Sequence, residues 1–351
     1  MQQPDNLLTR SLDRHETVNL GLTVTPLEHL NRLGTTLGIT LLAKRDDQTS
    51  LALGGNKVRQ LEYYLGQAKA HRADTILITG AVQSNFVRLC AAAARTQGWH
   101  PVVQLEDRVL NKDSIYHQSG NVLLNHLLGA DIHYFATGED EKAADANLDS
   151  IAEDISGKGG KPYVIHLGME HPPLGALGYA GCAAEIHAQC QQQRRWPDHV
   201  VIPSGSGLTH AGFLVGARSL GWDVPVHGIC VRRAAGPQHK RILTRSRELN
   251  GLLGDLTAIT EADVRVYDHV LSPGYGQLNA STLSAIKHSA RTEAMLLDPV
   301  YSGRTMAGLI NLVDTGTIKP HQTVLFIHTG GIPALFAYQD ELTAAALVNP
   351  R

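Results

Sequence analysis

Short apolar runs rich in valine and isoleucine alternate along the chain with longer stretches in which alanine, leucine and valine return every three or four residues. The short runs predict buried strands and the longer stretches predict helices, because side chains repeat every two residues on a strand and every 3.6 on a helix. Strands followed by helices are typical of a mainly parallel sheet covered by helices. The predicted strands are residues 75–79, 101–105, 132–135, 163–166, 200–203, 226–231, 264–267 and 324–328, and the clearest predicted helices are 84–96, 208–220 and 303–313.

The chain has 351 residues, more than one hydrophobic core usually takes, so two lobes are expected. Turn residues coincide with a change of local character near residues 49–55 and 168–174. We therefore predict a two-lobed α/β protein with open, mainly parallel sheets flanked by helices. A large domain is expected from residues 1–51 and 168–351, with a small α/β domain, 52–167, inserted into it.

Composition excludes several classes of function. Hydrophobic residues make up 43% of the chain and charged residues 18%, and the formal net charge of −2 gives no reason to expect binding to nucleic acid or an anionic membrane. No run of 18 apolar residues is present, and residues 1–6 lack the pattern of a signal peptide. The cysteines lack the C-x-x-C spacing of zinc and redox sites, so we expect reduced thiols, a cytoplasmic protein and no bound metal. They are Cys90, Cys182, Cys190 and Cys230.

Lys57 follows the sequence Gly54-Gly55-Asn56 and opens an apparent helix. The glycines can adopt positive φ and let the backbone approach a flat ligand closely. An amine forms a Schiff base only when it is unprotonated, and burial away from water favours the neutral amine. The alternative is an ordinary surface lysine at the start of a helix, which the local sequence also allows.

A second candidate site is the loop that joins the predicted strand 200–203 to a helix. Consecutive backbone N–H groups at such a junction, together with the helix dipole, form a cup for a phosphate dianion, to which Ser206 and Thr209 can add hydroxyl donors. His210 stands where a dinucleotide fingerprint needs glycine, and no Gly-Lys-Ser/Thr closes a P-loop. A plain strand-turn-helix corner is the alternative. The predicted cup consists of Gly205, Ser206, Gly207, Leu208 and Thr209.

The sequence Gln83-Ser84-Asn85 leaves the carboxyl end of the predicted strand 75–79, the edge at which open α/β sheets bind ligands. Ser84 is a suitable N-cap, and the amides of Gln83 and Asn85 can donate hydrogen bonds, so this helix start can hold a substrate carboxylate. Capping alone would explain Ser84 but not the two amides beside it.

Two tyrosines lie in glycine-containing turns, Tyr275 in Pro-Gly-Tyr-Gly and Tyr301 in Val-Tyr-Ser-Gly. A phenol can stack on an aromatic ring, or exchange a proton with a substrate if nearby charge lowers its pKa. Ordinary loop packing is the alternative. Thr329 ends the predicted strand 324–328 just before two glycines, where its hydroxyl could meet a ring nitrogen.

Taken in order, these stretches resemble the family of pyridoxal-phosphate enzymes that joins D-cysteine desulfhydrases with 1-aminocyclopropane-1-carboxylate deaminases, which has the tryptophan-synthase-β fold, fold type II. The resemblance covers almost the whole chain, and the combination of motifs is highly specific. Its motifs lie at residues 44–47, 54–57, 80–85, 205–212, 274–276, 298–303 and 328–333.

The resemblance implies that pyridoxal 5'-phosphate is the cofactor, that Lys57 binds it covalently, and that the cup holds its phosphate. Ser84 and Asn85 would bind the substrate carboxylate, Asn85 would also face the cofactor's 3-hydroxyl, and the two tyrosines would flank the substrate. The implied catalytic residues are Lys57, Ser84, Tyr275 and Tyr301, and the implied substrate-binding residues are Gln83, Ser84, Asn85 and Phe86.

Ser302 and Thr329 distinguish the two branches of the family. Deaminases typically carry glutamate after the second tyrosine and leucine in place of Thr329, so the two hydroxyls here resemble the desulfhydrases. A hydroxyl partner leaves the cofactor's ring nitrogen largely unprotonated, which suits prompt loss of a β leaving group. The chain departs from the desulfhydrase pattern at Phe86, where histidine is usual, and at 168–173, where a turn rich in glycine and serine is common.

The resemblance thus implies a homodimeric lyase that acts on a small amino acid by β-elimination, converting D-cysteine to pyruvate, hydrogen sulfide and ammonia. Lys57 or a tyrosinate would remove the α-proton. A 1-aminocyclopropane-1-carboxylate deaminase and an L-cysteate sulfo-lyase are the alternatives among enzymes. A non-catalytic pyridoxal-phosphate carrier is the alternative from another class, although a carrier has no use for a carboxylate cradle and two phenols.

Overall fold

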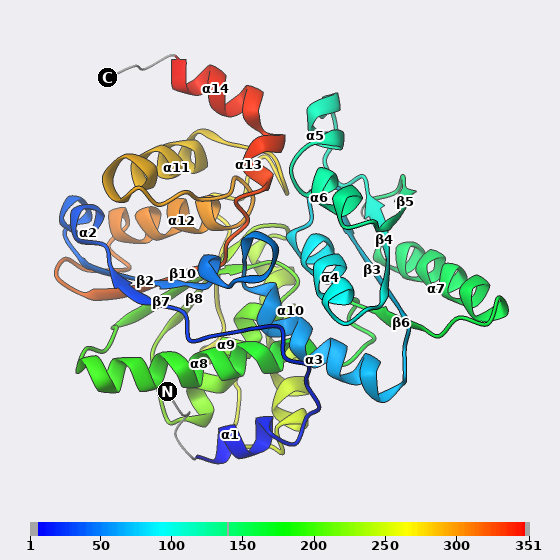
Figure 1. The fold of residues 1–351 in the computed structure, drawn as a ribbon. Helices are drawn as coiled ribbons and strands as arrows, with labels where there is room; N and C mark the ends of the chain where they lie inside the picture. The colour runs from blue at the N-terminus through cyan, green and yellow to red at the C-terminus, as the bar shows by residue number, and fades with distance from the viewer. Residues whose placement is uncertain (1–5, 139, 348–351) are drawn as a thin grey trace.

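A six-stranded sheet forms the larger part of the protein in the computed structural model, which describes residues 6–138 and 140–347 (Figure 1). Its strand order is β1-β2-β10-β7-β8-β9, and all neighbours run parallel except β1 and β2. The strands are β1 (Leu27–His29), β2 (Thr40–Arg45), β7 (His199–Ser204), β8 (Val226–Cys230), β9 (Arg265–Tyr267) and β10 (Thr323–His328).

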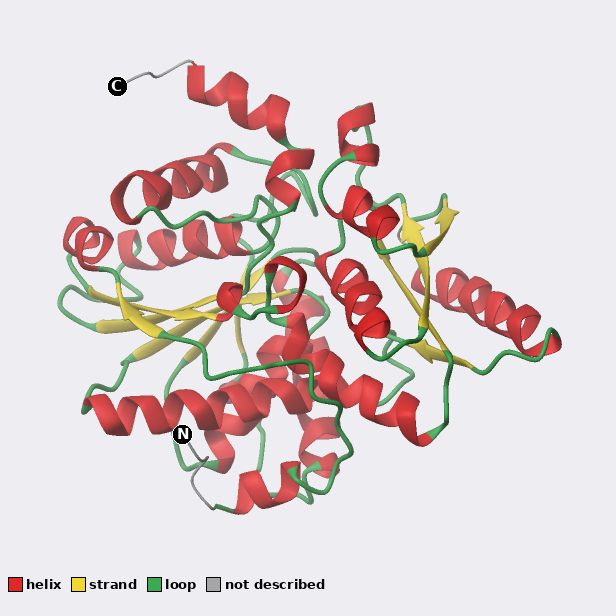
Figure 2. Ribbon diagram, viewed as in Figure 1, coloured by secondary structure: helices red, strands yellow, loops and turns green. Residues whose placement is uncertain are grey.

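A second, four-stranded sheet has the order β5-β4-β3-β6, with every pair parallel. Helices surround both sheets, and Figure 2 shows the two sheets as separate layers with helices between them. The strands are β3 (Thr75–Ala81), β4 (His100–Glu106), β5 (Asp131–Phe135) and β6 (Pro162–Ile165).

The helices are α1 (Leu7–Leu12), α2 (Asn31–Leu37), α3 (Lys57–Ala70), α4 (Asn85–Thr96), α5 (Ser114–Gln118), α6 (Asn121–Leu127), α7 (Glu141–Gly157), α8 (Leu174–Gln193), α9 (Leu208–Ser219), α10 (Ala235–Leu252), α11 (Ala280–Glu293), α12 (Ser302–Asp314), α13 (Ala334–Ala337) and α14 (Gln339–Leu347). None of the helices in residues 6–138 and 140–347 is long and apolar enough to span a membrane.

The α/β architecture predicted from the sequence is confirmed, and each of the eight predicted strands and three predicted helices coincides with an observed element. Strands β1 and β2 were not predicted. The first has only three residues, too few to display a period of two. The second ends in Lys44 and Arg45, whose charges conceal a strand that is nevertheless mostly buried.

The two sheets divide the chain where its turn residues cluster. Every strand of the smaller sheet lies between residues 75 and 165, and every strand of the larger sheet lies outside that range. Helix α3 contacts both α4 and α8, and a Cβ on Gly178 of α8 would lie 2.1 Å from the Arg59 carbonyl oxygen. The chain therefore passes from one sheet to the other between residues 45 and 75 and returns between 165 and 199, and α3 joins the two units.

A buried network of charges holds the start of α3 against β2 and α8. Arg59 pairs with Asp46 and with Glu185, each at 2.9 Å, and Lys44 also pairs with Glu185. Burial alone would raise the pKa of Asp46, but Arg59 and Lys44 lower it to about 2. The motif at residues 44–47 therefore positions α3, whose first residue is Lys57, and does not itself line the cavity described below.

Candidate active site

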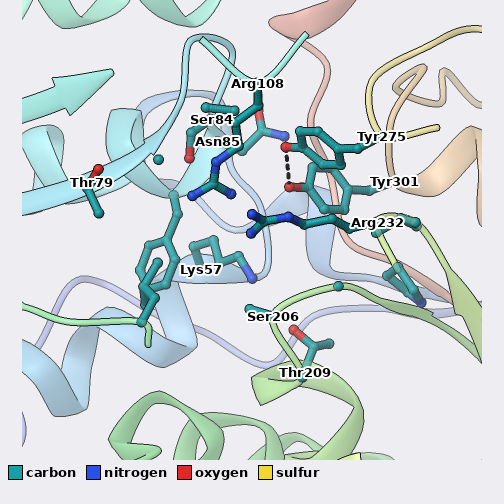
Figure 3. A pocket seen from close by; sticks show the side chains of 18 of the residues that line it. Lys57, Thr79, Ser84, Asn85, Arg108, Ser206, Thr209, Arg232, Tyr275 and Tyr301 are labelled. Carbon is teal, nitrogen blue, oxygen red and sulfur yellow. Dashed lines mark hydrogen bonds between the residues drawn. The ribbon is translucent and has the colours of Figure 1, made fainter. Parts of the chain in front are cut away.

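A cavity lies between the two sheets, at the carboxyl ends of β3, β4, β7 and β8 (Figure 3). The volume of the cavity that the centre of a water molecule can occupy is about 110 Å³. One water needs roughly 10–15 Å³ on the same measure, so the cavity can hold a small molecule. Most of the predicted site residues line it, although they come from separate stretches of the chain. They are Lys57, Ser84, Asn85, Phe86, Gly205, Ser206, Gly207, Thr209, Tyr275, Tyr301 and Thr329.

Lys57 is the first residue of α3 and follows a turn that contains two glycines. Gly54 and Gly55 have φ of 69° and 131°, and a Cβ on Gly54 would lie 2.2 Å from the Asp47 carbonyl oxygen. The buried Arg88 guanidinium donates to the Gly54 carbonyl oxygen at 3.1 Å. Positions 54 and 55 therefore require glycine. The Arg88 guanidinium, which has no acidic partner within residues 6–138 and 140–347, braces the turn.

Burial lowers the pKa of the Lys57 amine to about 8. Its Nζ lies 5.1 Å from the centre of the Phe86 ring, and it makes no ion pair within residues 6–138 and 140–347. A large fraction of this amine is therefore neutral at mildly alkaline pH, the state that covalent attachment to an aldehyde requires.

The loop before α9 presents uncapped backbone N–H groups to the cavity. Gly207, with φ of 101°, precedes the helix without a side-chain cap. The Thr209 hydroxyl oxygen accepts hydrogen bonds from Asn56 Nδ2 at 3.0 Å and Gln60 Nε2 at 2.9 Å. Because both acceptor positions of the oxygen are used, its own proton can only be donated outward. This set of donors fits a phosphate dianion.

Asn56 and Gln60 were not predicted as site residues, although Asn56 lies beside Lys57 in the sequence. Leu208, which was predicted for the cup, begins α9, and its side chain is buried in the core instead of lining the cavity.

The end of β3 places two of the three predicted carboxylate ligands in the cavity. Ser84 caps α4 by accepting the Val87 N–H at 3.2 Å. The Asn85 side-chain oxygen accepts from Asn121 Nδ2 at 2.9 Å, which turns the amide of Asn85 so that its nitrogen is available for another acceptor.

Gln83 does not line the cavity, contrary to the prediction. Its Nε2 donates to the carbonyl oxygens of Tyr116 and Ser119 at 2.6 and 3.0 Å, and its Oε1 accepts the Asn121 N–H at 2.9 Å. The amide is buried and satisfied by the backbone around α5 and α6, so it braces this loop and has no bond to spare for a substrate.

The two predicted tyrosines, Tyr275 and Tyr301, both line the cavity, and their hydroxyl groups face each other. Their hydroxyls share a hydrogen bond of 2.9 Å (Figure 3). Burial, reinforced by the Tyr275 phenol, raises the pKa of Tyr301 well above its ordinary value. Tyr301 is therefore a neutral phenol at physiological pH, which favours a proton donor over the tyrosinate base considered from the sequence.

Ser302 is buried and does not line the cavity, although it was predicted to face the cofactor ring. Its hydroxyl donates to Asp298 Oδ1 at 2.6 Å. The same carboxylate accepts backbone N–H groups of Val300, Tyr301 and Ser302 at 2.9, 2.9 and 2.6 Å. Ser302 therefore belongs to the capping of α12, and Thr329 supplies the hydroxyl on this side of the cavity.

A buried acid and an arginine from the end of β4 complete the upper wall. Arg108 donates to both carboxylate oxygens of Glu106, at 2.7 and 2.8 Å, and Glu106 also accepts the Thr79 hydroxyl at 2.7 Å. Glu106 and Arg108 were not predicted as site residues from the sequence. Their position directly after the predicted strand 101–105, at the ligand-binding edge of a parallel sheet, was the signal that could have found them.

Glu141, at the start of α7, links the smaller sheet's unit to three arginines of the larger one. It lies 2.7 Å from Arg232 and 3.5 Å from Arg241, and it also pairs with Arg233. Burial opposes ionisation, but the three guanidinium charges lower the pKa of Glu141. Glu141, Arg232 and Arg241 line the cavity, so two of the three cations that share this carboxylate face the site.

Comparison with known proteins gives the chemistry of related chains. A family profile described as pyridoxal-phosphate dependent enzyme matches residues 18–330. D-cysteine desulfhydrases of Salmonella schwarzengrund and Salmonella choleraesuis are each 42% identical over 318 residues, 91% of this chain and 94% of theirs.

Solved structures of related enzymes share the fold of this chain. A homologue of 1-aminocyclopropane-1-carboxylate deaminase, 31% identical, superposes with a TM-score of 0.86 over 97% of this chain and 99% of its own. A threonine deaminase, 17% identical, superposes with a TM-score of 0.61 over 93% of this chain and 97% of its own and shares the fold.

Proposed function

Because the chain belongs to the family of pyridoxal-phosphate dependent enzymes, we propose that it is a lyase that converts D-cysteine to pyruvate, hydrogen sulfide and ammonia by β-elimination. The observation that carries this proposal is one cavity that holds a lysine amine of lowered pKa, a phosphate cup, a carboxylate cradle and two phenols. The relatives named D-cysteine desulfhydrase support the choice of substrate.

The cofactor is held, in this proposal, by residues whose chemistry suits each of its groups. Lys57 bonds to it covalently, the backbone from Gly205 to Gly207 and the Thr209 hydroxyl bind its phosphate, and Thr329 meets its ring nitrogen. When bound, pyridoxal phosphate supplies an electron-withdrawing ring that stabilises negative charge at the substrate's α-carbon.

The protein's own residues hold the substrate and move its protons. The start of α4, with Ser84 and the Asn85 amide, binds the carboxylate. Once the substrate's amine has displaced Lys57 from the cofactor, the freed Lys57 amine takes the α-proton as the α C–H bond breaks. The electron pair then expels thiolate from Cβ, and the neutral Tyr301 phenol, which is hydrogen-bonded to Tyr275, donates a proton to the leaving sulfur. Water then converts the product of elimination to pyruvate and ammonia.

A substrate panel tests this proposal. Purified protein loaded with cofactor should release pyruvate from D-cysteine and β-chloro-D-alanine, and little 2-oxobutyrate from 1-aminocyclopropane-1-carboxylate. Thr329→Ser should retain the elimination, whereas Thr329→Leu, which removes the hydroxyl, should depress it. Faster opening of the cyclopropane ring than elimination from D-cysteine would show that the enzyme is a deaminase.

A second substrate is favoured by one observation, the arginines of the cavity. Figure 3 shows Arg108 and Arg232 pointing toward the space between Lys57 and the tyrosine pair. Arg241 donates to the Ser206 carbonyl oxygen at 2.7 Å and so lies on the phosphate side. Arg108 is engaged by both oxygens of Glu106, whereas Arg232 shares Glu141 with two other arginines. Arg232 is therefore the cation best placed to pair with an anionic β-substituent, such as the sulfonate of L-cysteate.

L-Cysteate and D-cysteine can be compared in one assay. If the β-substituent is a sulfonate, L-cysteate should yield pyruvate, ammonia and sulfite, and Arg232→Met should lower kcat/KM for L-cysteate far more than for D-cysteine. Activity on D-cysteine with none on L-cysteate leaves the desulfhydrase proposal intact and removes the sulfo-lyase.

A further inference from the structure

Two histidines and an aspartate meet beside the active-site cavity, where α7, the end of β6 and the turn before α8 come together. The candidate ligand atoms of Asp145, His166 and His171 all lie within 4.8 Å of one another. The proposed reaction uses none of these side chains. We propose that the three residues bind a divalent transition-metal ion such as zinc.

His166 is arranged as a metal-binding histidine usually is. Its Nδ1 is buried, forms no hydrogen bond within the described residues, and faces Asp145 Oδ1 across 3.8 Å. Its other ring nitrogen, Nε2, lies 3.1 Å from Asp149 Oδ1. A carboxylate that receives the second N–H fixes the tautomer and leaves the first nitrogen as a lone-pair donor, the arrangement that commonly surrounds a ligating imidazole.

Packing of the turn at residues 168–173 places His171 and Asp145 beside His166. The rings of His166 and His171 stack at 3.9 Å with an interplanar angle of 8°. Arg245 donates to the His171 carbonyl oxygen at 2.7 Å and so anchors the turn. A Cβ on Gly168 would lie 2.6 Å from Asp145 Oδ2, so a larger residue at position 168 would displace this carboxylate.

Two imidazole nitrogens and one carboxylate oxygen select the class of ion. This set suits zinc and its neighbours in the first transition row better than calcium or magnesium, which prefer oxygen ligands. Zinc bonds of about 2.0–2.2 Å place tetrahedral ligands about 3.4 Å apart, so the stacked imidazole rings would have to turn until their nitrogens face one point. Water would occupy the remaining position.

An ion at this position would connect two segments of the fold. Asp145 belongs to α7 and also lines the active-site cavity, whereas His171 belongs to the turn at residues 168–173 that leads into α8. This turn is also where the chain departs from the desulfhydrase pattern. The ion would therefore join α7 to the segment that connects the smaller sheet to the larger unit.

Zinc binding to the enzyme loaded with cofactor tests the proposal. The protein is titrated with Zn²⁺ in competition with a chelator of known affinity, and bound zinc is counted by elemental analysis. We expect one zinc per chain in the parent and in a control, His126→Ala, which removes an exposed histidine of α6. We expect at least tenfold weaker binding in His166→Ala and in His171→Ala, and about 10- to 100-fold weaker binding in Asp149→Asn.

The parent's cofactor spectrum serves as the check that each variant is folded. If His166→Ala does not fold, His171→Ala, at a half-buried position of the turn, decides the question. Absence of a one-to-one zinc in the parent overturns the proposal, and so does binding at the parent's affinity in a folded variant of either histidine. Because the readout is bound metal, failure of the proposed lyase activity leaves this result interpretable.

Discussion

The neutral amine of Lys57 makes the stability of the cofactor-free protein depend on pH. Burial lowers the pKa of Lys57 to about 8 from an ordinary value of 10.5. Below pH 8 both the folded and the unfolded chain carry the charge, and the folded chain bears the penalty of burying it. Between pH 8 and 10.5 only the unfolded chain binds the proton, so stability rises with pH over this window, by up to about 3 kcal/mol.

Lys57→Met should therefore remove this rise and stabilise the cofactor-free protein at pH 7. Urea unfolding of parent and variant at several pH values from 7 to 10 measures the difference, which isolates Lys57 from other titrating groups. Parallel profiles for the two proteins would mean that the amine is not desolvated.

Thr209→Val should weaken retention of pyridoxal phosphate by about 10- to 150-fold, because one hydrogen bond to a charged group contributes roughly 1.5–3 kcal/mol. The Thr209 oxygen already accepts from Asn56 and Gln60, so only its proton is lost to the ligand. Equilibrium dialysis measures the cofactor affinity. Thr282→Val, at a buried threonine of α11, is the matched control and should bind as the parent does.

At the scale of elements, glycines set how closely α8 and α9 approach beneath the phosphate cup. A Cβ on Gly212 of α9 would lie 2.3 Å from the Ala176 carbonyl oxygen and 2.6 Å from Tyr179 Cβ. Gly212→Ala should force the helices apart and destabilise the protein by about 1–3 kcal/mol.

Thermal and urea unfolding check this, with Gly251→Ala of α10 as the control. A Cβ on Gly251 has no neighbour within 4 Å, so that substitution should stabilise the protein by up to about 1 kcal/mol through helix propensity. Equal effects of the two substitutions would show that close packing of α8 and α9 is not needed.

For the whole molecule, Glu141 is expected to hold the two units together at the mouth of the cavity. Glu141→Gln leaves Arg232, Arg233 and Arg241 without their shared carboxylate. The start of α7 should then open more readily, by on the order of 1 kcal/mol, and its amides should exchange roughly fivefold faster.

Hydrogen exchange followed by mass spectrometry measures this effect. Glu153→Gln, at an exposed position of the same helix, is the matched control and should leave exchange unchanged. Unchanged exchange in Glu141→Gln would show that other contacts hold α7 in place.

Much of the fold and part of the site follow from contiguous sequence. All described strands except β1 and β2, the three clearest helices, the glycine turn before Lys57 and the loop before α9 were predicted, because periodicity and turn chemistry are properties of neighbouring residues. The carboxyl ends of parallel strands then bring those loops to one edge, which is why Lys57, Ser84 and Thr209 share a cavity.

Only the tertiary structure decided which polar side chains face that cavity. Gln83 and Ser302 have suitable chemistry, but the backbone near α5 and the Asp298 carboxylate satisfy their hydrogen bonds. Asn56 meets Thr209 from 153 positions away, and Glu141 meets arginines of another unit. A buried polar group must bond to whatever partner the packing supplies, and for these residues that partner lies too far along the chain for any local pattern to show it.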